Sequence, residues 1–179
     1  MSARYSRAQD TTLSARFAAP SQEWSLARQL LLQPEGIEAA QSARGRWALA
    51  RCVARLGDPH HGELELLNLQ QSSELDLQRL GVGLAECNVL LGDLERARFC
   101  LDRLFELDPD HEDGTLLELE LFRATPPADC VHSVQTLLER LPQSRRLKIA
   151  CADFLFDWKQ PEIARRIYQA AIEQHGLRG

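Results

Sequence analysis

A spaced repetition of small and apolar residues constrains the fold of this chain more than any other feature of its sequence. Four times, a small residue is followed four and seven positions later by apolar residues, and then by a turn. The small residues are Gly62, Ala97, Cys130 and Ala164, so successive sets are offset by 35, 33 and 34 residues. Such a period is typical of stacked helical hairpins, none of which can bury its apolar face alone. It predicts an all-α fold, an α-α superhelix built as a solenoid of antiparallel hairpins.

Turn residues divide the chain into nine predicted helices. Gly57-Asp58 and Gly92-Asp93 each end a helix, because Gly favours the left-handed cap, and Pro161 suits a first helical turn. The predicted ranges are 21–32, 37–56, 60–71, 74–91, 94–107, 112–124, 128–141, 144–158 and 161–175. No alternating run predicts a strand, and the short loops make neighbouring helices antiparallel.

The ends and the apolar content of the chain predict its organisation and location. Residues 1–19 are polar and contain no continuous apolar segment, so we expect a flexible N-terminal segment there and a repeat domain over residues 20–179. No stretch approaches the ~18 apolar residues of a membrane span. These features predict a cytoplasmic protein.

Charge and cysteine content narrow the classes of function. The net charge of −5 argues against a nucleic-acid partner, which usually selects a basic face. The five cysteines form no CxxC or CxH pair, so a zinc site is not expected. They are predicted to be free, mostly buried thiols in a reducing compartment.

The residues of one segment, 78–110, carry a family resemblance. It has Leu84 and Ala85, then the Gly92-Asp93 turn, and then Ala97, Leu101, Leu104 and Pro109. These residue types at this spacing resemble the tetratricopeptide-repeat (TPR) family, and the resemblance extends over about residues 44–176. The segment 21–32 is then either a leading half-repeat or a cap.

Pairs of small residues twelve positions apart support the same assignment. They are Ala50 with Gly62, Ala85 with Ala97, and Ala152 with Ala164. A small side chain is needed where two helices cross closely, since a large one would push the axes beyond ~8–10 Å. The third repeat departs from the pattern, with Glu118 at the small-residue position and Pro126-Pro127 in place of Gly-Asp.

The TPR resemblance implies a binding surface, because in such stacks the first helices of successive hairpins line the concave face. We expect that face to form a groove for a protein or peptide segment with acidic and apolar features. Alternatively, the aromatic residues pack between hairpins and the arginines are solvated. The candidate partner-binding residues are Arg44, Trp47, Arg51, Arg79, Glu86, Phe122, Arg146, Asp153 and Phe156.

Catalytic and cofactor chemistry finds no support in the sequence. No GxSxG, HExxH or Gly-rich phosphate loop occurs, and His60-His61 alone lacks the partners of a metal site. We therefore expect a non-enzymatic adaptor or chaperone without cofactor or metal. One alternative is a structural subunit that forms homo-oligomers through an apolar face around Leu116–Phe122 and through Trp158. The other, an enzyme or metal protein, rests only on the His pair and the thiols.

Overall fold

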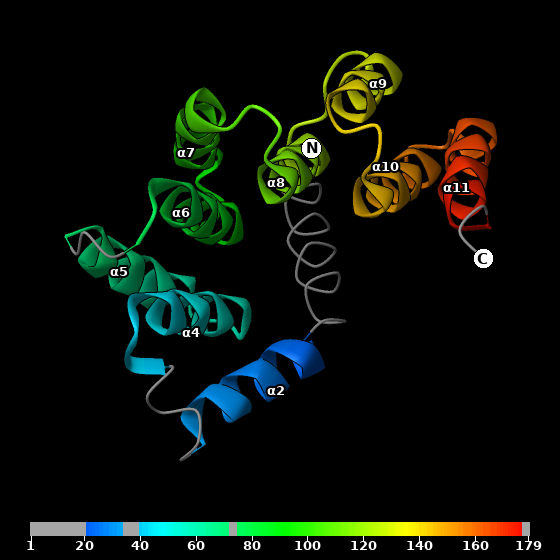
Figure 1. Cartoon of the computed structure of the whole chain (residues 1–179). Helices are drawn as coiled ribbons and strands as arrows, with labels where there is room; N and C mark the ends of the chain where they lie inside the picture. Colours follow the sequence, from blue (N-terminus) through cyan, green and yellow to red (C-terminus); the bar gives the residue numbers. More distant parts are fainter. Residues whose placement is uncertain (1–20, 34–39, 72–74, 177–179) are drawn as a thin grey trace, which may run out of the picture. The chain divides into compact units, whose positions relative to one another are not determined.

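The computed structural model describes residues 21–33, 40–71 and 75–176, and these residues form helices and short turns (Figure 1). Nine α-helices lie in the described part, and no strand is found there. The flexible segment predicted over residues 1–19 lies outside the described residues. The helices are α2 (Ser21–Leu32), α4 (Ala43–Arg55), α5 (Pro59–Gln70), α6 (Leu77–Leu91), α7 (Leu94–Leu107), α8 (Glu112–Ala124), α9 (Cys130–Arg140), α10 (Arg145–Asp157) and α11 (Pro161–Gly176).

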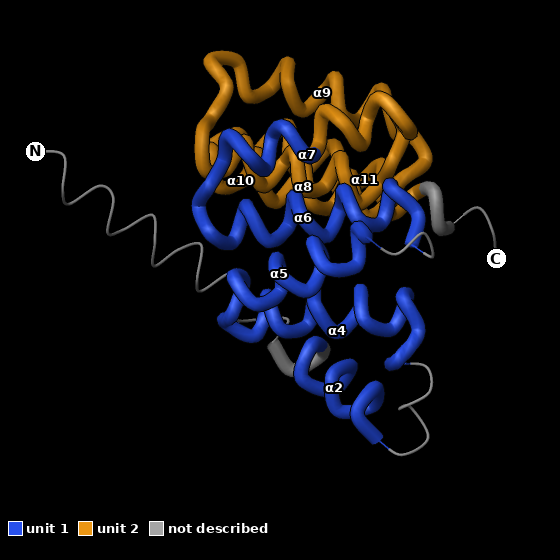
Figure 2. Tube along the Cα trace, turned by 90° about the vertical axis from the view of Figure 1, so that its left-hand side faces the viewer, with its two compact units in different colours: residues 1–100 blue, residues 101–179 orange. Residues whose placement is uncertain are grey.

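The chain divides into two compact units, residues 1–100 and 101–179 (Figure 2). The division falls within α7, which runs from Leu94 to Leu107. In unit 1, α4 packs against α2, α5 and α6. In unit 2, α10 packs against α8, α9 and α11. The prediction of a single domain over residues 20–179 stays a prediction.

Side chains at the helix starts explain where the helices begin. The carboxylate of Asp76 accepts a hydrogen bond from the backbone N–H of Arg79 at 2.7 Å, and Asp58 accepts one from His61 at 3.1 Å. Each satisfies a backbone donor that the first helical turn leaves without a partner. At the other end of α6, Gly92 adopts the left-handed conformation with φ 76°, as the Gly-Asp turns predicted.

One predicted helix is interrupted. The sequence predicted a continuous helix over residues 37–56, but α4 begins at Ala43, after Ser42 with φ −63° and ψ 154°. The Ser42 hydroxyl accepts a hydrogen bond from the N–H of Gly45 at 3.0 Å, so Ser42 caps a new helix instead of continuing an earlier one. Ala40 and Gln41 are helical just before it, and residues 34–39 lie outside the described part.

The first hairpin of unit 1 shows why its crossing requires small residues. A Cβ atom added at Gly62 would lie 2.7 Å from the carbonyl oxygen of Ala50 and 2.8 Å from Cβ of Ala54. Helices α4 and α5 therefore approach nearly to backbone contact, which confirms the predicted Ala50–Gly62 pair. Leu66 and Leu69 follow Gly62 on the same face of α5, and both are fully buried in the core of unit 1.

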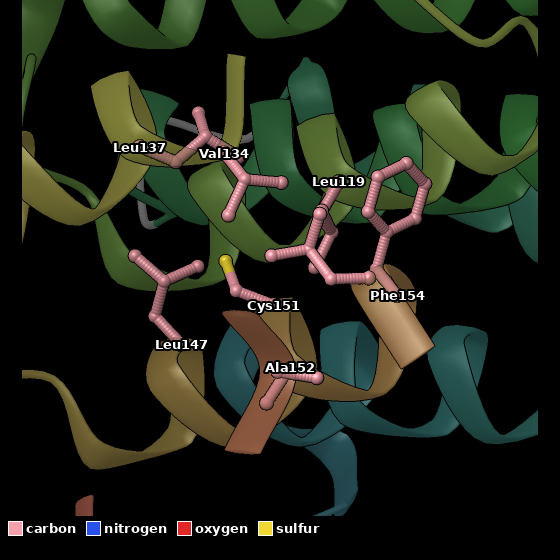
Figure 3. Packing of buried hydrophobic residues seen from close by; sticks show 9 residues of the cluster. Leu119, Val134, Leu137, Leu147, Cys151, Ala152 and Phe154 are labelled. Carbon is pink, nitrogen blue, oxygen red and sulfur yellow. The ribbon is translucent and has the colours of Figure 1, made fainter. Parts of the chain in front are cut away.

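Unit 2 has its own core, which lies between α8, α9, α10 and α11 (Figure 3). Ala152 and Ala164, the predicted small pair of the last hairpin, are both buried in it. The cluster consists of Leu119, Val134, Leu137, Leu147, Cys151, Ala152, Phe154, Leu155 and Ala164.

The third hairpin, formed by α8 and α9, is built differently. Its helices make far fewer close backbone approaches than α4 with α5 or α10 with α11. Glu118 occupies the position where the other hairpins have a small residue, and it pairs with Arg140 of α9 at 2.9 Å. The guanidinium of Arg140 also lies 4.8 Å from the ring centroid of Phe105. Longer side chains thus fill this hairpin, which explains the departure seen in the sequence.

Candidate protein-binding surfaces

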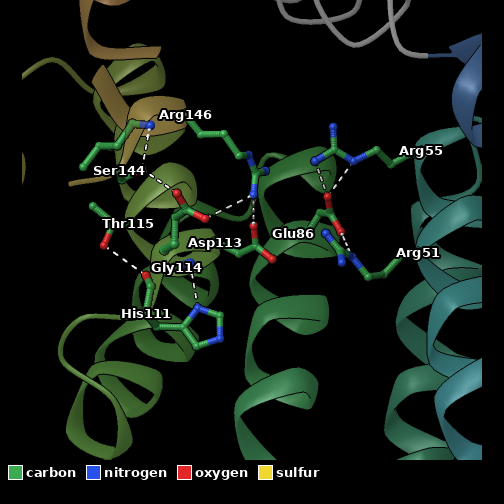
Figure 4. Close-up of polar contacts among 11 residues, drawn as sticks. Arg51, Arg55, Glu86, His111, Asp113, Gly114, Thr115, Ser144 and Arg146 are labelled. Carbon is green, nitrogen blue, oxygen red and sulfur yellow. Dashed lines mark hydrogen bonds and ion pairs between the residues drawn. The ribbon is translucent and has the colours of Figure 1, made fainter. Parts of the chain in front are cut away.

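In unit 1, a buried carboxylate brings together two arginines of α4 (Figure 4). The Nε–H groups of Arg51 and Arg55 donate to the two oxygens of Glu86, each at 2.5 Å. Glu86 lies on α6 and is only 1% exposed, so its charge is compensated inside the unit. Two guanidinium groups are thereby held together on α4, the first helix of the hairpin formed by α4 and α5.

Trp47 joins the same cluster. The guanidinium of Arg51 lies 4.7 Å from the centroid of the Trp47 ring, within the range of a cation–π contact. The indole N–H of Trp47 donates to the backbone carbonyl of Arg79 at 2.8 Å. A Cβ atom at Gly83 would lie 3.2 Å from that indole nitrogen, so a larger residue at position 83 would crowd the indole ring. Trp47 is therefore a half-buried link between α4 and α6.

The side chains of the other two candidates of unit 1, Arg44 and Arg79, have other surroundings. The side chain of Arg79 pairs with Asp76 at the start of its own helix. Arg44 lies in the first turn of α4 and is exposed. Of the five candidates in this unit, the structure thus brings Trp47, Arg51 and Glu86 together.

In unit 2, Arg146 at the start of α10 reaches the preceding first helix. Its guanidinium lies 3.0 Å from a carboxylate oxygen of Asp113 and 3.5 Å from one of Glu112, both in the first turn of α8 (Figure 4). Arg146 remains well exposed, which limits the free energy that such a pair contributes to about 0–1 kcal/mol. The side chain is thus oriented toward α8 while remaining accessible.

Farther along α10, Asp153 and Phe156 have different surroundings. Asp153 accepts a hydrogen bond from the Tyr168 hydroxyl of α11. That bond, helped by partial burial and by the charges of Asp153 and Asp157, raises the pKa of Tyr168 to about 12. Phe156 is 63% exposed. Asp153 is therefore engaged within the unit, whereas Phe156 presents an aromatic ring to solvent.

The third aromatic candidate, Phe122, lies elsewhere. It is partly buried and packs against the hydrophobic cluster of unit 2. Trp47 packs in the same manner against the cluster of unit 1. Trp47 and Phe122 thus pack against the cores of their units, whereas Phe156 is exposed, and its place in a binding groove stays a prediction.

Two residues of the unit 1 cluster were missed from the sequence. Arg55 follows Arg51 by four residues, which is one helical turn, and this spacing was the available signal. Trp24 of α2 lies 5.5 Å and 5.1 Å from the guanidinium carbons of Arg51 and Arg55, measured to its ring centroid. The four repeated sets begin at Gly62 and do not include Trp24, so the sequence offered no comparable signal for it.

The cysteines and the metal-ligating side chains were the other candidates for chemistry in the sequence. All five cysteines are free. Burial raises the pKa of Cys151 to about 12, and burial together with the charges of Glu86 and Glu63 raises that of Cys87 to about 12. Within the described ranges, no group of three or more His, Cys, Asp or Glu side chains is arranged to bind a metal ion.

The helices of residues 21–33, 40–71 and 75–176 include no candidate for a membrane span. None of the helices combines the length and the apolar character that crossing a bilayer requires.

Comparison with known proteins supports the fold class. No protein-family model and no curated protein matches the chain. Among solved structures, MamA MSR-1 matches with a TM-score of 0.52 and 14% identity, covering 98% of this chain and 97% of that chain. MamA AMB-1 matches with a TM-score of 0.48 and 15% identity, covering 93% and 92%. At such identities, the first match informs on fold alone: the chain has an all-α, TPR-like fold, as its repeats predicted.

Proposed function

We propose that this chain is a non-enzymatic protein-interaction module that binds a segment of a partner protein on the faces of its first helices. The observation that carries the proposal is a stripe along α10. Arg146, Ile149, Asp153 and Phe156 recur at spacings of three, four and three residues, which places them on one face of the helix. Phe156 is 63% exposed and Ile149 is 37% exposed, so the stripe offers apolar contacts flanked by charge.

The chemistry of this stripe indicates the partner. An exposed aromatic ring and an aliphatic side chain suit the apolar face of a helical or extended segment. Arg146 is already paired with Glu112 and Asp113 of α8, so these three side chains together carry a net charge of −1 and do not attract a further carboxylate. We therefore propose a partner segment that contacts the stripe mainly through apolar side chains.

In unit 1, we assign the corresponding role to the surface around Arg44, Trp47, Arg51 and Arg79. Glu86 positions the guanidinium groups there, since it is buried beneath them. Phe122 is partly buried and packs against the core of unit 2, so we propose a supporting role for it.

The role we propose is that of a cytoplasmic adaptor or chaperone. Five free thiols suit a reducing compartment. The net charge of −5 favours a protein partner over a nucleic acid.

Two exposed phenylalanines provide a matched test. Phe156 lies on a first helix, whereas Phe99 lies on α7, a second helix, and is 66% exposed. The tagged chain should capture a partner from an extract of its source cells, and Phe156→Ser should reduce the amount captured about tenfold, the effect of losing about 1.4 kcal/mol. Phe99→Ser should capture as much as the wild type. Equal capture by all three proteins would contradict the assignment of the first-helix face.

Self-association was expected through the run Leu116–Phe122 and through Trp158, and Trp158 is 40% exposed. Leu117, Leu119 and Leu121 are buried in the described structure, and Leu116 and Phe122 pack against the core of unit 2. This apolar run thus stabilises its own unit. Light scattering over a range of concentrations tests the alternative, for which we expect a constant molar mass.

A further inference from the structure

Helix α2 covers the arginines of the unit 1 surface. It packs against α4, and the ring of Trp24 lies 5.5 Å from the guanidinium of Arg51 and 5.1 Å from that of Arg55. Both guanidinium groups are also held by hydrogen bonds to Glu86. The indole ring of Trp24 therefore contacts two guanidinium groups whose positions are already fixed. Such a pair of cations favours aromatic ligands.

The burial of α2 distinguishes it from the other helices of unit 1. No described side chain of α2 is fully buried, whereas α4, α5 and α6 each bury at least four residues. Leu26 is 56% exposed and Leu30 is 53% exposed. A helix of twelve residues is marginal in water on its own, so α2 depends on this thin contact. Elements with few buried contacts open locally, well before the unit unfolds.

We infer that α2 is an intramolecular ligand of the unit 1 surface, and that it is displaced by a partner helix presenting an aromatic side chain in the place of Trp24. The inference rests on the proposed function, since it concerns the surface assigned there to partner binding. While α2 is docked, its indole occupies the contact with Arg51 and Arg55. The partner must then compete with α2. The apparent affinity of the partner equals its intrinsic affinity multiplied by the fraction of molecules in which α2 is undocked.

The aromatic ring is the feature of α2 that the surface recognises. Trp24 makes cation–π contacts with both arginines, whereas Leu26, Leu30 and Leu32 of α2 are each more than half exposed. The ring carries no charge, so its binding to the arginines does not require the carboxylate of a partner. The unit 1 surface thus selects for an aromatic residue on a helix, in contrast to the apolar stripe proposed on α10.

A peptide of residues 21–33 of this chain, labelled with a fluorophore, is the probe for this competition. It is titrated with the full-length wild type, with full-length Trp24→Ala and with full-length Leu30→Ala, and its anisotropy is measured. Trp24→Ala should bind the peptide at least tenfold more tightly than the wild type, because its own α2 no longer competes. Leu30→Ala, which alters an exposed residue of the same helix, should bind like the wild type.

A further protein variant and a variant peptide locate the binding site. The double variant Trp24→Ala/Arg51→Ala should lose the gained affinity, and a peptide carrying Trp24→Ala should not bind any of the chains. Circular dichroism of the double variant checks that its helices are retained.

Three outcomes would overturn the inference. One is equal affinity of the wild type and Trp24→Ala for the peptide, and another is no binding to either. The third is a wild-type molar mass that rises with concentration and falls in Trp24→Ala, since α2 would then dock on a second copy. The Phe156→Ser capture assay concerns a different unit, so the proposed function can fail or hold independently of these results.

Discussion

Replacing Gly62 with alanine tests the close crossing on which the first hairpin depends. The new Cβ would lie 2.7 Å from the carbonyl oxygen of Ala50, whereas ordinary contacts of a Cβ begin near 3.4 Å. Helix α5 must therefore move away from α4 by about 0.7 Å, since the atoms it meets belong to backbone and to a Cβ, which cannot rotate away. The shift would loosen Leu66 and Leu69, which pack on the same face.

Two opposing effects set the magnitude of this change. Overpacking a tight site costs about 1–3 kcal/mol, and we expect the upper part of that range because the obstacle is rigid. Alanine is favoured over glycine within a helix by about 1 kcal/mol. The net loss in the free energy of unfolding should therefore be about 1–2 kcal/mol. A crossing without close contact would give the opposite sign, since only the helix propensity would remain.

Urea denaturation followed by circular dichroism measures this difference. Asn68→Ala is the matched control, because Asn68 lies on the exposed face of the same helix, where alanine meets no neighbour. Its free energy of unfolding should stay within about 0.5 kcal/mol of the wild type or rise slightly. If Gly62→Ala were as stable as Asn68→Ala, the close packing of α4 on α5 would be refuted.

Three further predictions concern charged and titrating groups. Glu86→Gln should lower the free energy of unfolding by about 2–4 kcal/mol in urea titrations, because two arginines lose a buried carboxylate. The control Glu65→Gln, at an exposed ion pair with Arg46, should lower it by less than about 1 kcal/mol. Equal losses in the two variants would contradict the buried network. Cys87, whose pKa burial raises to about 12, should react with a thiol-specific disulfide reagent only upon unfolding, and fast reaction in the native protein would disagree. The folded pKa of Tyr168 lies above its ordinary value of 10, so its contribution to stability is present below pH 10 and is lost as the pH rises toward about 12. Asp153→Asn should lower that pKa in an absorbance titration, and an unchanged value would exclude the hydrogen bond as its cause.

The positions of the helices were predictable because they depend on local signals. Helices α7 and α8 have the predicted bounds, since Gly92-Asp93 and Pro109 mark the adjoining turns in the sequence itself. The predicted start of the helix that contains α4 was wrong, because Ser42 is compatible both with a continuing helix and with the cap of a new one. The choice between them depends on the backbone conformation at that residue, which a periodic pattern does not reveal.

The candidate surfaces were predictable only in part, because a repeat pattern identifies a face but not the partners of each side chain. Arg51 was assigned to the binding face, and yet it pairs with Glu86, 35 residues away, which is one repeat. Trp24 was not assigned, because it contacts Arg51 from a helix that precedes the four repeated sets. Contacts between elements distant in sequence require the packed structure, since no local spacing encodes them.

Site-specific photo-crosslinking in living cells tests most directly whether the first-helix face binds a partner protein. A photoreactive phenylalanine analogue replaces Phe156 on α10 or, in a separate protein, Phe99 on α7, two positions of nearly equal exposure. We predict a discrete crosslinked product with another protein from position 156, and only background from position 99. Equal products from both positions, or a product from position 99 alone, would contradict binding on the first-helix face.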